Sequence, residues 1–413
     1  MYFRKIYPGV FLFGGIKMLE LFMIMMITGS LGSQFLSTGG DELITCKNDR
    51  MLELLWFIGY CGEFPSQLAV HIGGHPEWNR HLKYEAIKKE YVSVFRGEYQ
   101  ERTVRSLRLT DKGIDYISQR DPKSLVYVLV KNEEHIKSLK HVGIEKVVRR
   151  HATATALIMA HNAGAIFLPD RKPSIYFKDP TQVKISPIDP GKIYFYSSDE
   201  LRAGIQEFDK NSVAKTSRLL GIIIAGHRCY CLYYTGYRRM FWRKNQEENT
   251  VAAIDTMLAR RGFKCTVFSQ VIIASNMRVS AKLAKIDYTG RSKYYTVSDE
   301  ANNCFFVENS MRGDQQLGTI IDLQLQQELN RKILQHYNPP PNITRNYDAV
   351  TKDGRRPVIL GYLFDLIPLV HMSPLVDGFP EAPVILCFDY QVSAIQTIVG
   401  PLIAVCPIEE ANI

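Results

Sequence analysis

Between residues 51 and 120, apolar residues recur first in compact blocks and then at every second position. Residues 51–60 form an apolar block long enough for a helix, and Gly62 ends it. Two further helices are expected around Pro65 and Pro76, because proline lacks the N–H that a first helical turn leaves unpaired. This stretch therefore predicts three consecutive helices.

A strand hairpin is expected after the third helix, because polar and apolar residues alternate over 91–95 and 103–109. Thr110 is placed to cap a closing helix, DKGIDYISQ. Three helices, a two-stranded hairpin and a final helix follow the order of a winged helix-turn-helix. We therefore predict an α+β chain with this unit at residues 51–120.

The third helix, residues 76–90, carries the residues expected to read bases. Trp78, Leu82 and Ala86 fall on one apolar stripe and are expected in the core, whereas the polar residues near the helix start lie off it. Arginine can bind guanine through two hydrogen bonds, and asparagine can bind adenine in the same way. Arginines in the hairpin are expected to contact phosphates or the minor groove. The predicted DNA contacts of the unit are Asn79, Arg80, Lys83, Lys88, Arg102 and Arg105.

The rest of the chain divides into three expected parts: a helical connector at 121–192, an α/β domain at 193–300 and a second α/β lobe at 301–413. The connector is expected to hold a strand at 126–130 and helices at 132–139 and 144–163. Arg149, Arg150 and His151 lie on the second helix, where a face covering a domain junction is the simplest interpretation.

The α/β domain is expected to follow the order helix, three strands, helix, strand, which is that of restriction-endonuclease-like nucleases. Catalysis there needs an Asp on the second strand and a Glu-x-Lys on the third to hold a metal. CYCLYY and RMFWRK occupy those strands here and carry neither, so we predict a degenerate core. A metal-dependent nuclease or nicking enzyme remains an alternative function, using Glu200, Glu248, Asp365 and Asp389.

The segment YRRMFWRK interleaves basic and aromatic residues, a combination that suits phosphates and unstacked bases. The alternative is a hairpin whose aromatic side chains face the core while its charges face water. The candidate DNA contacts in this segment are Arg238, Arg239, Arg243 and Lys244.

Residues 1–50 are apolar and contain a partial copy of the unit that follows. Residues 18–36 match 51–69 at seven of nineteen positions. Lys17 and Glu20 interrupt the apolar run, leaving pieces too short to span ~30 Å of hydrocarbon. We therefore expect a truncated copy of the first half of the unit, without membrane association.

The charge balance favours an anionic partner. Lys and Arg number 51 against 42 Asp and Glu, a formal charge of +9. The eight cysteines form no CxxC pair and lie mostly in apolar, strand-like segments, which favours reduced, buried thiols. The sequence contains no familiar nucleotide-binding, metal-binding or nucleophile motif, so no cofactor, catalytic or metal site is predicted.

Several short motifs resemble the replication-relaxation family of plasmids and integrative mobile elements. They are CGEFP at 61–65, RLTDKG at 108–113, and the ordered set Ser217, Arg218, Gly221, Tyr230, Trp242 and Glu248. The resemblance implies a winged helix followed by an α/β domain, with a role in the DNA processing of a mobile element. It supplies no catalytic residues.

Together these features predict a cytoplasmic protein that binds double-stranded DNA, by sequence or by structure, in the replication, transfer or regulation of a mobile element. Replication or conjugation proteins and a second copy of the chain are further expected partners. An interaction module that docks such proteins without binding DNA is the remaining alternative.

Overall fold

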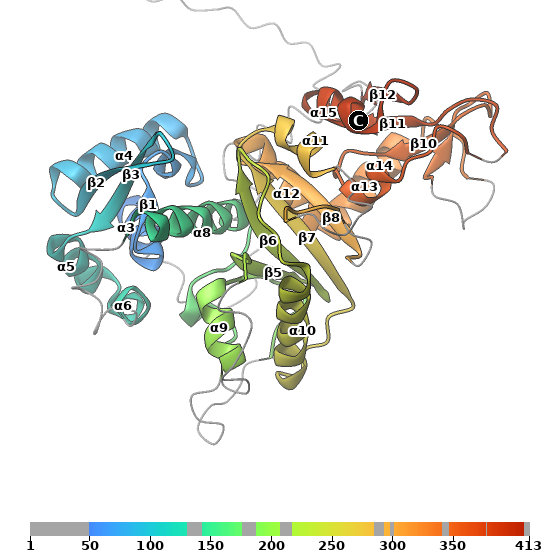
Figure 1. The fold of residues 1–413 in the computed structure, drawn as a ribbon. Helices are drawn as coiled ribbons and strands as arrows, with labels where there is room; N and C mark the ends of the chain where they lie inside the picture. The colour runs from blue at the N-terminus through green and yellow to red at the C-terminus, as the bar shows by residue number, and fades with distance from the viewer. Residues whose placement is uncertain are drawn as a thin grey trace, which may run out of the picture.

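The computed structural model describes residues 49–129, 143–175, 187–206, 217–284, 293–297, 301–340, 347–376 and 378–408. These residues form a mixed α and β fold with three sheets, which confirms the α+β prediction at that level (Figure 1). The partial copy at 18–36 and the predicted helix at 132–139 lie outside them. No helix within the described ranges combines the length and the apolar character needed to cross a membrane.

The N-terminal unit begins with a long helix and ends with two short ones. Its elements are α3 (Arg50–Cys61), β1 (Phe64–Pro65), the 3₁₀ helix η1 (Leu68–His71), α4 (Pro76–Lys88), β2 (Val92–Tyr99), β3 (Arg102–Leu109), α5 (Asp111–Arg120) and α6 (Pro122–Leu129). β1 and β2 flank β3 in an antiparallel sheet. Thr110 accepts a hydrogen bond from the N–H of Gly113 and so caps α5, as the sequence predicts.

Two predictions in this region are wrong. The second expected helix is only the single 3₁₀ turn η1. The strand expected at 126–130 overlaps α6, which packs on α3 and α5. A short apolar run does not distinguish a strand from a helix by periodicity, and here packing against two helices decides the outcome.

α8 (Ile144–Asn162) lies between the N-terminal unit and the central sheet (Figure 1). The side chains of residues 154–160 on this helix are buried. The helix packs on α3 and β1 on one side and on β4, β6 and α12 on the other. Much of the expected connector is therefore a central core helix. A short 3₁₀ turn, η2 (Pro169–Arg171), follows it.

The central sheet has five strands: β4 (Ile193–Ser197), β5 (Gly221–Ala225), β6 (Arg228–Gly236), β7 (Val267–Ala274) and β8 (Asn303–Glu308), in that order. β4, β5 and β6 are antiparallel neighbours, whereas β7 and β8 run parallel to β6. Alternate residues of the strands point to opposite faces. One face packs on α8 and α12 (Met311–Ile321), and the other on α9 (Ser198–Gln206) and α10 (Lys244–Arg260).

The strand expected at 239–242 does not form. β6 carries a bulge between Tyr234 and Gly236, after which the chain leaves the sheet, and only an isolated bridge joins Phe241 to Tyr294. Bulges end regular pairing and redirect the chain. The order helix, three strands, helix, strand is therefore absent from 198–274. β8 also extends the sheet beyond the predicted boundary at residue 300.

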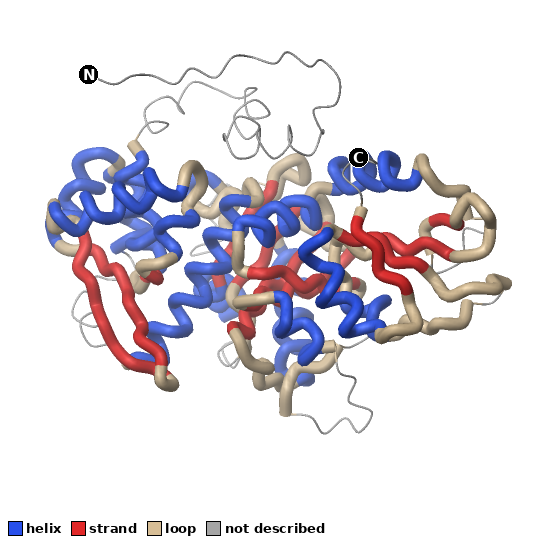
Figure 2. The backbone as a smooth tube through the Cα atoms, turned by 90° about the horizontal axis from the view of Figure 1, so that it is seen from above, coloured by secondary structure: helices blue, strands red, loops and turns tan. Residues whose placement is uncertain are grey.

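The C-terminal part adds a second, smaller sheet. Its strands are β9 (Ala349–Val350), β10 (Pro357–Leu360), β11 (Val384–Cys387) and β12 (Ala404–Pro407), in the order β12-β11-β10-β9. β10, β11 and β12 are parallel to one another, and β9 is antiparallel to β10. Figure 2 shows the N-terminal hairpin at one end of the molecule and this sheet at the other.

Short helices surround this sheet. They are α13 (Leu323–Leu334), α14 (Leu366–Val370), the 3₁₀ turn η5 (Asp389–Gln391) and α15 (Val392–Val399), with η4 (Met277–Val279) and α11 (Ser280–Leu283) beside them. α12 and α13 are separated at Asp322, whose side chain accepts hydrogen bonds from the N–H groups of Gln324 and Leu325 and so caps α13. The seven described cysteines are free thiols, five of them buried.

Candidate nucleic-acid interface

α4 presents a face to solvent that differs from the predicted one. Pro76 begins the helix, and the ring Nδ1 of His75 accepts a hydrogen bond from the N–H of Glu77. Trp78, which the apolar stripe placed in the core, is 62% exposed, and Tyr84 is 59% exposed. Ala86 is buried and Leu82 packs against the core, as predicted, whereas Asn79 is buried in place of Trp78. The inward-facing stripe is therefore Asn79, Leu82 and Ala86, and only its first position differs from the prediction.

Asn79 is a correction to the predicted DNA contacts, because its side chain is buried. Its Nδ2 donates to the carbonyl oxygens of Ile72, Gly73 and Val70 in the preceding loop. Its Oδ1 accepts from Arg50 at 3.0 Å. Asn79 therefore holds the loop before α4 in place, and its amide has no atom left for a base edge.

Cations from α4 and from the hairpin converge beside this helix. Arg80 is exposed and pairs with Glu77 at 2.5 Å, one helical turn away. Partial burial lowers the pKa of Lys83, and the nearby charges of Arg80 and Arg105 lower it further. Arg105 belongs to β3, so the positive charges that act on Lys83 come from both the helix and the hairpin. Lys88 is exposed at the end of the helix.

The base of the hairpin is fixed by a buried polar network. Glu63 is fully buried and accepts hydrogen bonds at 2.7 Å from both Arg108 and Ser106 of β3. The hydroxyl of Ser106 also contacts Nε2 of His151 on α8 at 3.0 Å. Burial lowers the pKa of His151 to about 4, so this ring is neutral at neutral pH. The network connects the hairpin to α8 and to the segment between α3 and β1, where Glu63 lies.

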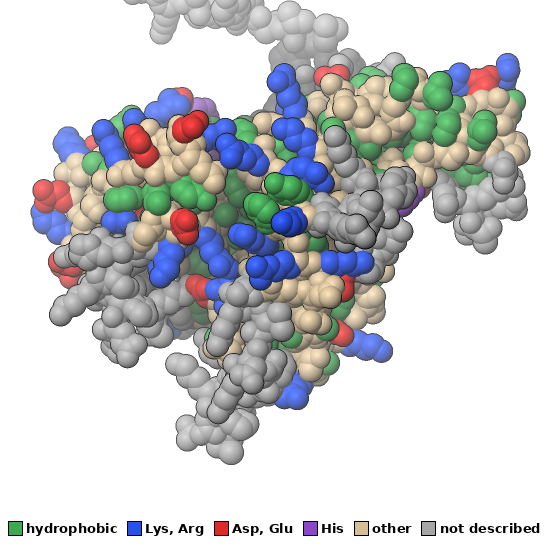
Figure 3. All heavy atoms as spheres, viewed as in Figure 1, with side chains coloured by type: hydrophobic (Ala, Val, Ile, Leu, Met, Phe, Trp, Pro, Cys, Tyr) green, Lys and Arg blue, Asp and Glu red, His purple; other side chains and the backbone are tan. Residues whose placement is uncertain are grey.

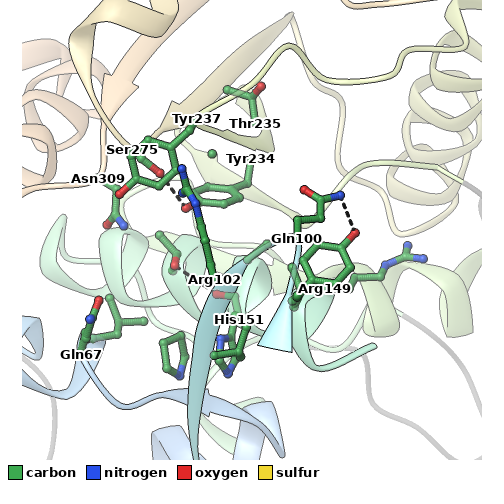
Figure 4. A pocket seen from close by; sticks show the side chains of 18 of the residues that line it. Gln67, Gln100, Arg102, Arg149, His151, Tyr234, Thr235, Tyr237, Ser275 and Asn309 are labelled. Atoms are coloured by element: carbon green, nitrogen blue, oxygen red, sulfur yellow. Dashed lines mark hydrogen bonds between the residues drawn. The ribbon is translucent and has the colours of Figure 1, made fainter. Parts of the chain in front are cut away.

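The tip of the hairpin reaches the central sheet. Gln100 and Glu101 form the turn with positive φ angles of 49° and 63°. The guanidinium of Arg102 lies over the ring of Tyr237, 4.1 Å from its centroid. Figure 4 shows Arg102 extending from the hairpin towards Tyr237 and Tyr234. Two basic segments more than 130 residues apart in sequence therefore meet here.

A cleft of about 1270 Å³ lies between the hairpin, the first half of α8 and the ends of β5 and β6 (Figure 4). Among the described residues that line it, Glu145 is the only carboxylate. Arg149 donates to the carbonyl of Ser217 at 3.1 Å, and burial together with the charges of Arg202 and Arg218 lowers its pKa. The cations that line the cleft are Arg102, Arg105, Lys146, Arg149, Arg218 and Arg238.

The predicted basic residues of 238–244 separate into two groups. Arg238 lines the cleft, and Arg239 lies over the ring of Tyr294, 5.1 Å from its centroid. Arg243 and Lys244 lie at the start of α10, where Lys244 pairs with Glu248 at 3.9 Å. Arg238 therefore faces the cleft and Arg239 packs on an aromatic ring, whereas Arg243 and Lys244 lie at the start of a helix without capping it.

Lys146, Arg149 and Arg218 are lining residues that the sequence did not predict as contacts. Arg149 was noticed, but as part of a helix face at a domain junction. The signal that it borders a cleft is its position opposite the hairpin, which depends on tertiary packing rather than on local pattern.

The acids that a metal-dependent nuclease would require have other partners. Glu200 accepts from Tyr60 and pairs with Lys172 at 2.8 Å. Asp365 accepts from Asn303 and from the N–H of Cys304, and it caps α14. Asp389 begins η5. In the part of the chain that the structure describes, no three His, Cys, Asp or Glu side chains are placed to hold a metal ion.

No protein-family model, curated protein or solved structure matches the chain. The motifs behind the family resemblance nevertheless have structural roles. Glu63 of CGEFP anchors the hairpin. A Cβ on Gly113 of RLTDKG would lie 2.2 Å from the carbonyl oxygen of Tyr91, so only glycine fits there. Ser217 of the third set donates to Glu247 at 2.5 Å, the residue before Glu248.

Proposed function

We propose that the chain binds double-stranded DNA through residues 50–120, acting as a winged helix-turn-helix. α4 takes the place of the recognition helix, and the β2–β3 hairpin takes that of the wing. The order α3, η1, α4, β2, β3, α5 supports this assignment, with the second helix reduced to a 3₁₀ turn.

The convergence of Arg80, Lys83 and Arg105 carries the proposal. Like charges repel one another, so a protein that keeps three of them together gains stability when an anion lies between them. These cations come from the helix and the hairpin, the two elements that contact DNA in this motif. The DNA backbone carries phosphate groups at regular spacing, so it can place an anion beside each of these cations.

Base recognition is assigned to the exposed start of α4. Arg80 would exchange Glu77 for the two acceptors of a guanine in the major groove. The exposed ring of Trp78 beside it provides apolar contact of the kind that thymine methyl groups accept. Arg102 and Arg105 would hold phosphates and set the orientation of the helix.

The test is DNA selection followed by binding measurements with the full chain. Duplex affinity is expected to fall steeply with salt, because phosphate contacts release counterions. Arg80→Ala should cost about 1–3 kcal/mol on the selected site and less on other sequences, whereas Arg105→Ala should weaken all sequences alike and reduce the salt slope by about one.

Arg331→Ala is the matched control, since Arg331 is an exposed cation on α13 in the C-terminal part. It should leave duplex affinity unchanged. A duplex affinity that does not respond to salt, or that falls equally with Arg331→Ala and Arg80→Ala, would overturn the proposal.

The family resemblance extends the proposal to context: DNA of a mobile element, with replication or transfer proteins as further partners. The nuclease alternative gains no support, because Glu200, Glu248 and Asp365 make structural contacts and no group of three possible ligands is placed to hold a metal in the described ranges.

A further inference from the structure

Two aromatic rings form an exposed shelf beside the cleft. Phe241 is 56% exposed and Tyr294 is 38% exposed, and their rings stack with centroids 4.8 Å apart and planes 29° apart. We call this pair the aromatic shelf. Large apolar side chains at the surface that lie next to one another are less usual than single ones and commonly mark a binding site.

Backbone hydrogen bonds and a ring contact of the neighbouring residues hold the aromatic shelf in place. The N–H of Trp242 donates to the carbonyl of Lys293 at 3.0 Å, and that of Tyr295 to the carbonyl of Met240 at 2.8 Å. The Trp242 ring packs edge-to-face on Tyr295, with centroids 4.9 Å apart. A ring that is already ordered loses little conformational entropy when a ligand stacks on it.

Positive charge surrounds the shelf. Arg239 lies over the ring of Tyr294, and Arg238 and Tyr237 lead from the shelf into the basic cleft. The ring of Tyr237 is itself 49% exposed. Figure 3 shows Lys and Arg side chains gathered over the middle of this face, around a small group of hydrophobic side chains.

We propose that the shelf and the cleft together bind a single strand of DNA. An unpaired base stacks on the face of Phe241 that is turned away from Tyr294, while Arg149, Arg218 and Arg238 hold the phosphates. Aromatic platforms beside a basic groove are the chemistry by which proteins bind single strands without reading their sequence.

The chemistry favours a single strand over other anions. Bases in a duplex have their faces covered by their neighbours, so a protein ring can stack only on a base that has left the helix. A small anion would not need a cleft of about 1270 Å³, which exceeds the ~300–1,000 Å³ of most small-molecule sites. An acidic peptide would engage the cations but has no flat faces for the shelf.

The single-strand site is adjacent to the unit that we propose binds duplex. Arg102 at the hairpin tip touches Tyr237, so the two surfaces adjoin. A DNA molecule that occupies both surfaces at once would be a junction, with its duplex part on the N-terminal unit and its single strand in the cleft. Only this last step rests on the proposed duplex binding; the single-strand site is argued from its own residues.

The experiment measures binding of the full chain to fluorescently labelled oligothymidylate, which forms no duplex. Phe241→Ala should weaken binding about tenfold or more, as expected when one stacked base is lost. Phe241→Trp should retain binding, because it keeps a flat ring. Trp242 fluorescence should change when oligothymidylate binds, since this ring supports the shelf.

Leu402→Ala is the matched control, because Leu402 is 73% exposed and lies near the C-terminal sheet. It should leave oligothymidylate affinity unchanged, and Phe241→Ala should leave duplex affinity unchanged. If the chain binds oligothymidylate but not duplex DNA, the proposed function is wrong and the single-strand site stands. Absent oligothymidylate binding, or equal binding by the wild type and Phe241→Ala, overturns the single-strand site. Tighter, Phe241-dependent binding of oligouridylate assigns it to RNA instead.

Discussion

The N-terminal unit and α10, which packs on the central sheet, each bury a glutamate, but the surroundings of the two carboxylates differ. Glu63 accepts hydrogen bonds from a cation, Arg108, at 2.7 Å. Glu247 accepts from the hydroxyl of Ser217 and the backbone N–H of Arg218, and burial raises its pKa despite these bonds. In the first case a guanidinium is used inside the fold, whereas in the second the guanidinium of Arg218 lines the cleft.

The difference teaches that the charge on a surface does not follow from the charge in the sequence. Arg108 and Arg105 are both in β3, yet one neutralises a buried carboxylate and the other is exposed. A buried carboxylate satisfied by neutral donors leaves nearby cations available to a ligand. Replacing Glu63 and Glu247 one at a time should therefore have different effects on stability and on ligand binding.

The largest effect is expected from Glu63→Gln. The change leaves the guanidinium of Arg108 largely buried without an anion, which typically costs about 3–5 kcal/mol. Urea denaturation should report this loss in the free energy of unfolding. Glu98→Gln, in the exposed part of the same hairpin, is the control and should leave stability nearly unchanged. Equal stability of both variants would show that the Glu63 network does not fix the hairpin.

Asp314 on α12 extends the comparison to a buried carboxylate without a cation. Asn162 donates to it at 2.7 Å, yet burial raises its pKa to about 7. The folded state therefore binds a proton that the unfolded state releases near pH 4, so stability should fall as pH rises from about 4 to 7. Asp314→Asn should remove this slope and stabilise the chain at pH 8 by up to about 4 kcal/mol. Parallel stability profiles for wild type and variant would contradict this.

The smallest effect is expected from Glu247→Gln. Its raised folded-state pKa means that the charged form is disfavoured, so the variant should gain stability at alkaline pH relative to acidic pH. Because Glu247 also interacts with Arg149 and Arg218, its removal leaves their charge less compensated. Oligothymidylate affinity should rise by roughly 0.5 kcal/mol, the size of a partly solvated charge interaction. An unchanged or lower affinity would indicate that these arginines do not contact phosphate.

Local patterns predicted the N-terminal unit well because its signals are local. The alternation in the hairpin and the cap at Thr110 fix those elements within a few residues. In α4 the prediction holds for Leu82 and Ala86 but fails at the helix start, because Trp78 is apolar but exposed, whereas Asn79 is polar but satisfied by three backbone carbonyls before the helix. Hydrophobicity alone cannot reveal a buried amide whose partners lie outside its own helix.

The cleft was beyond the reach of sequence patterns. Its cations come from β3, α8, the approach to β5 and the loop after β6, and periodicity carries no information about which distant segments face one another. The bulge near Gly236 is equally invisible, although it ends β6 and directs Tyr237 and Arg238 towards the hairpin. The sequence did indicate binding residues at Arg102, Arg105 and 237–244, but not that they face the same cleft.

One continuous apolar core joins α3, α8, α12 and a face of the central sheet. α3 cannot leave α8 without exposing the buried residues at 154–160 to water. The N-terminal unit and the sheet therefore belong to one cooperative unit, in which local opening of either weakens both. The distance between α4 and the aromatic shelf is consequently set by core packing rather than by a linker. The two surfaces therefore keep a fixed spacing and orientation relative to each other.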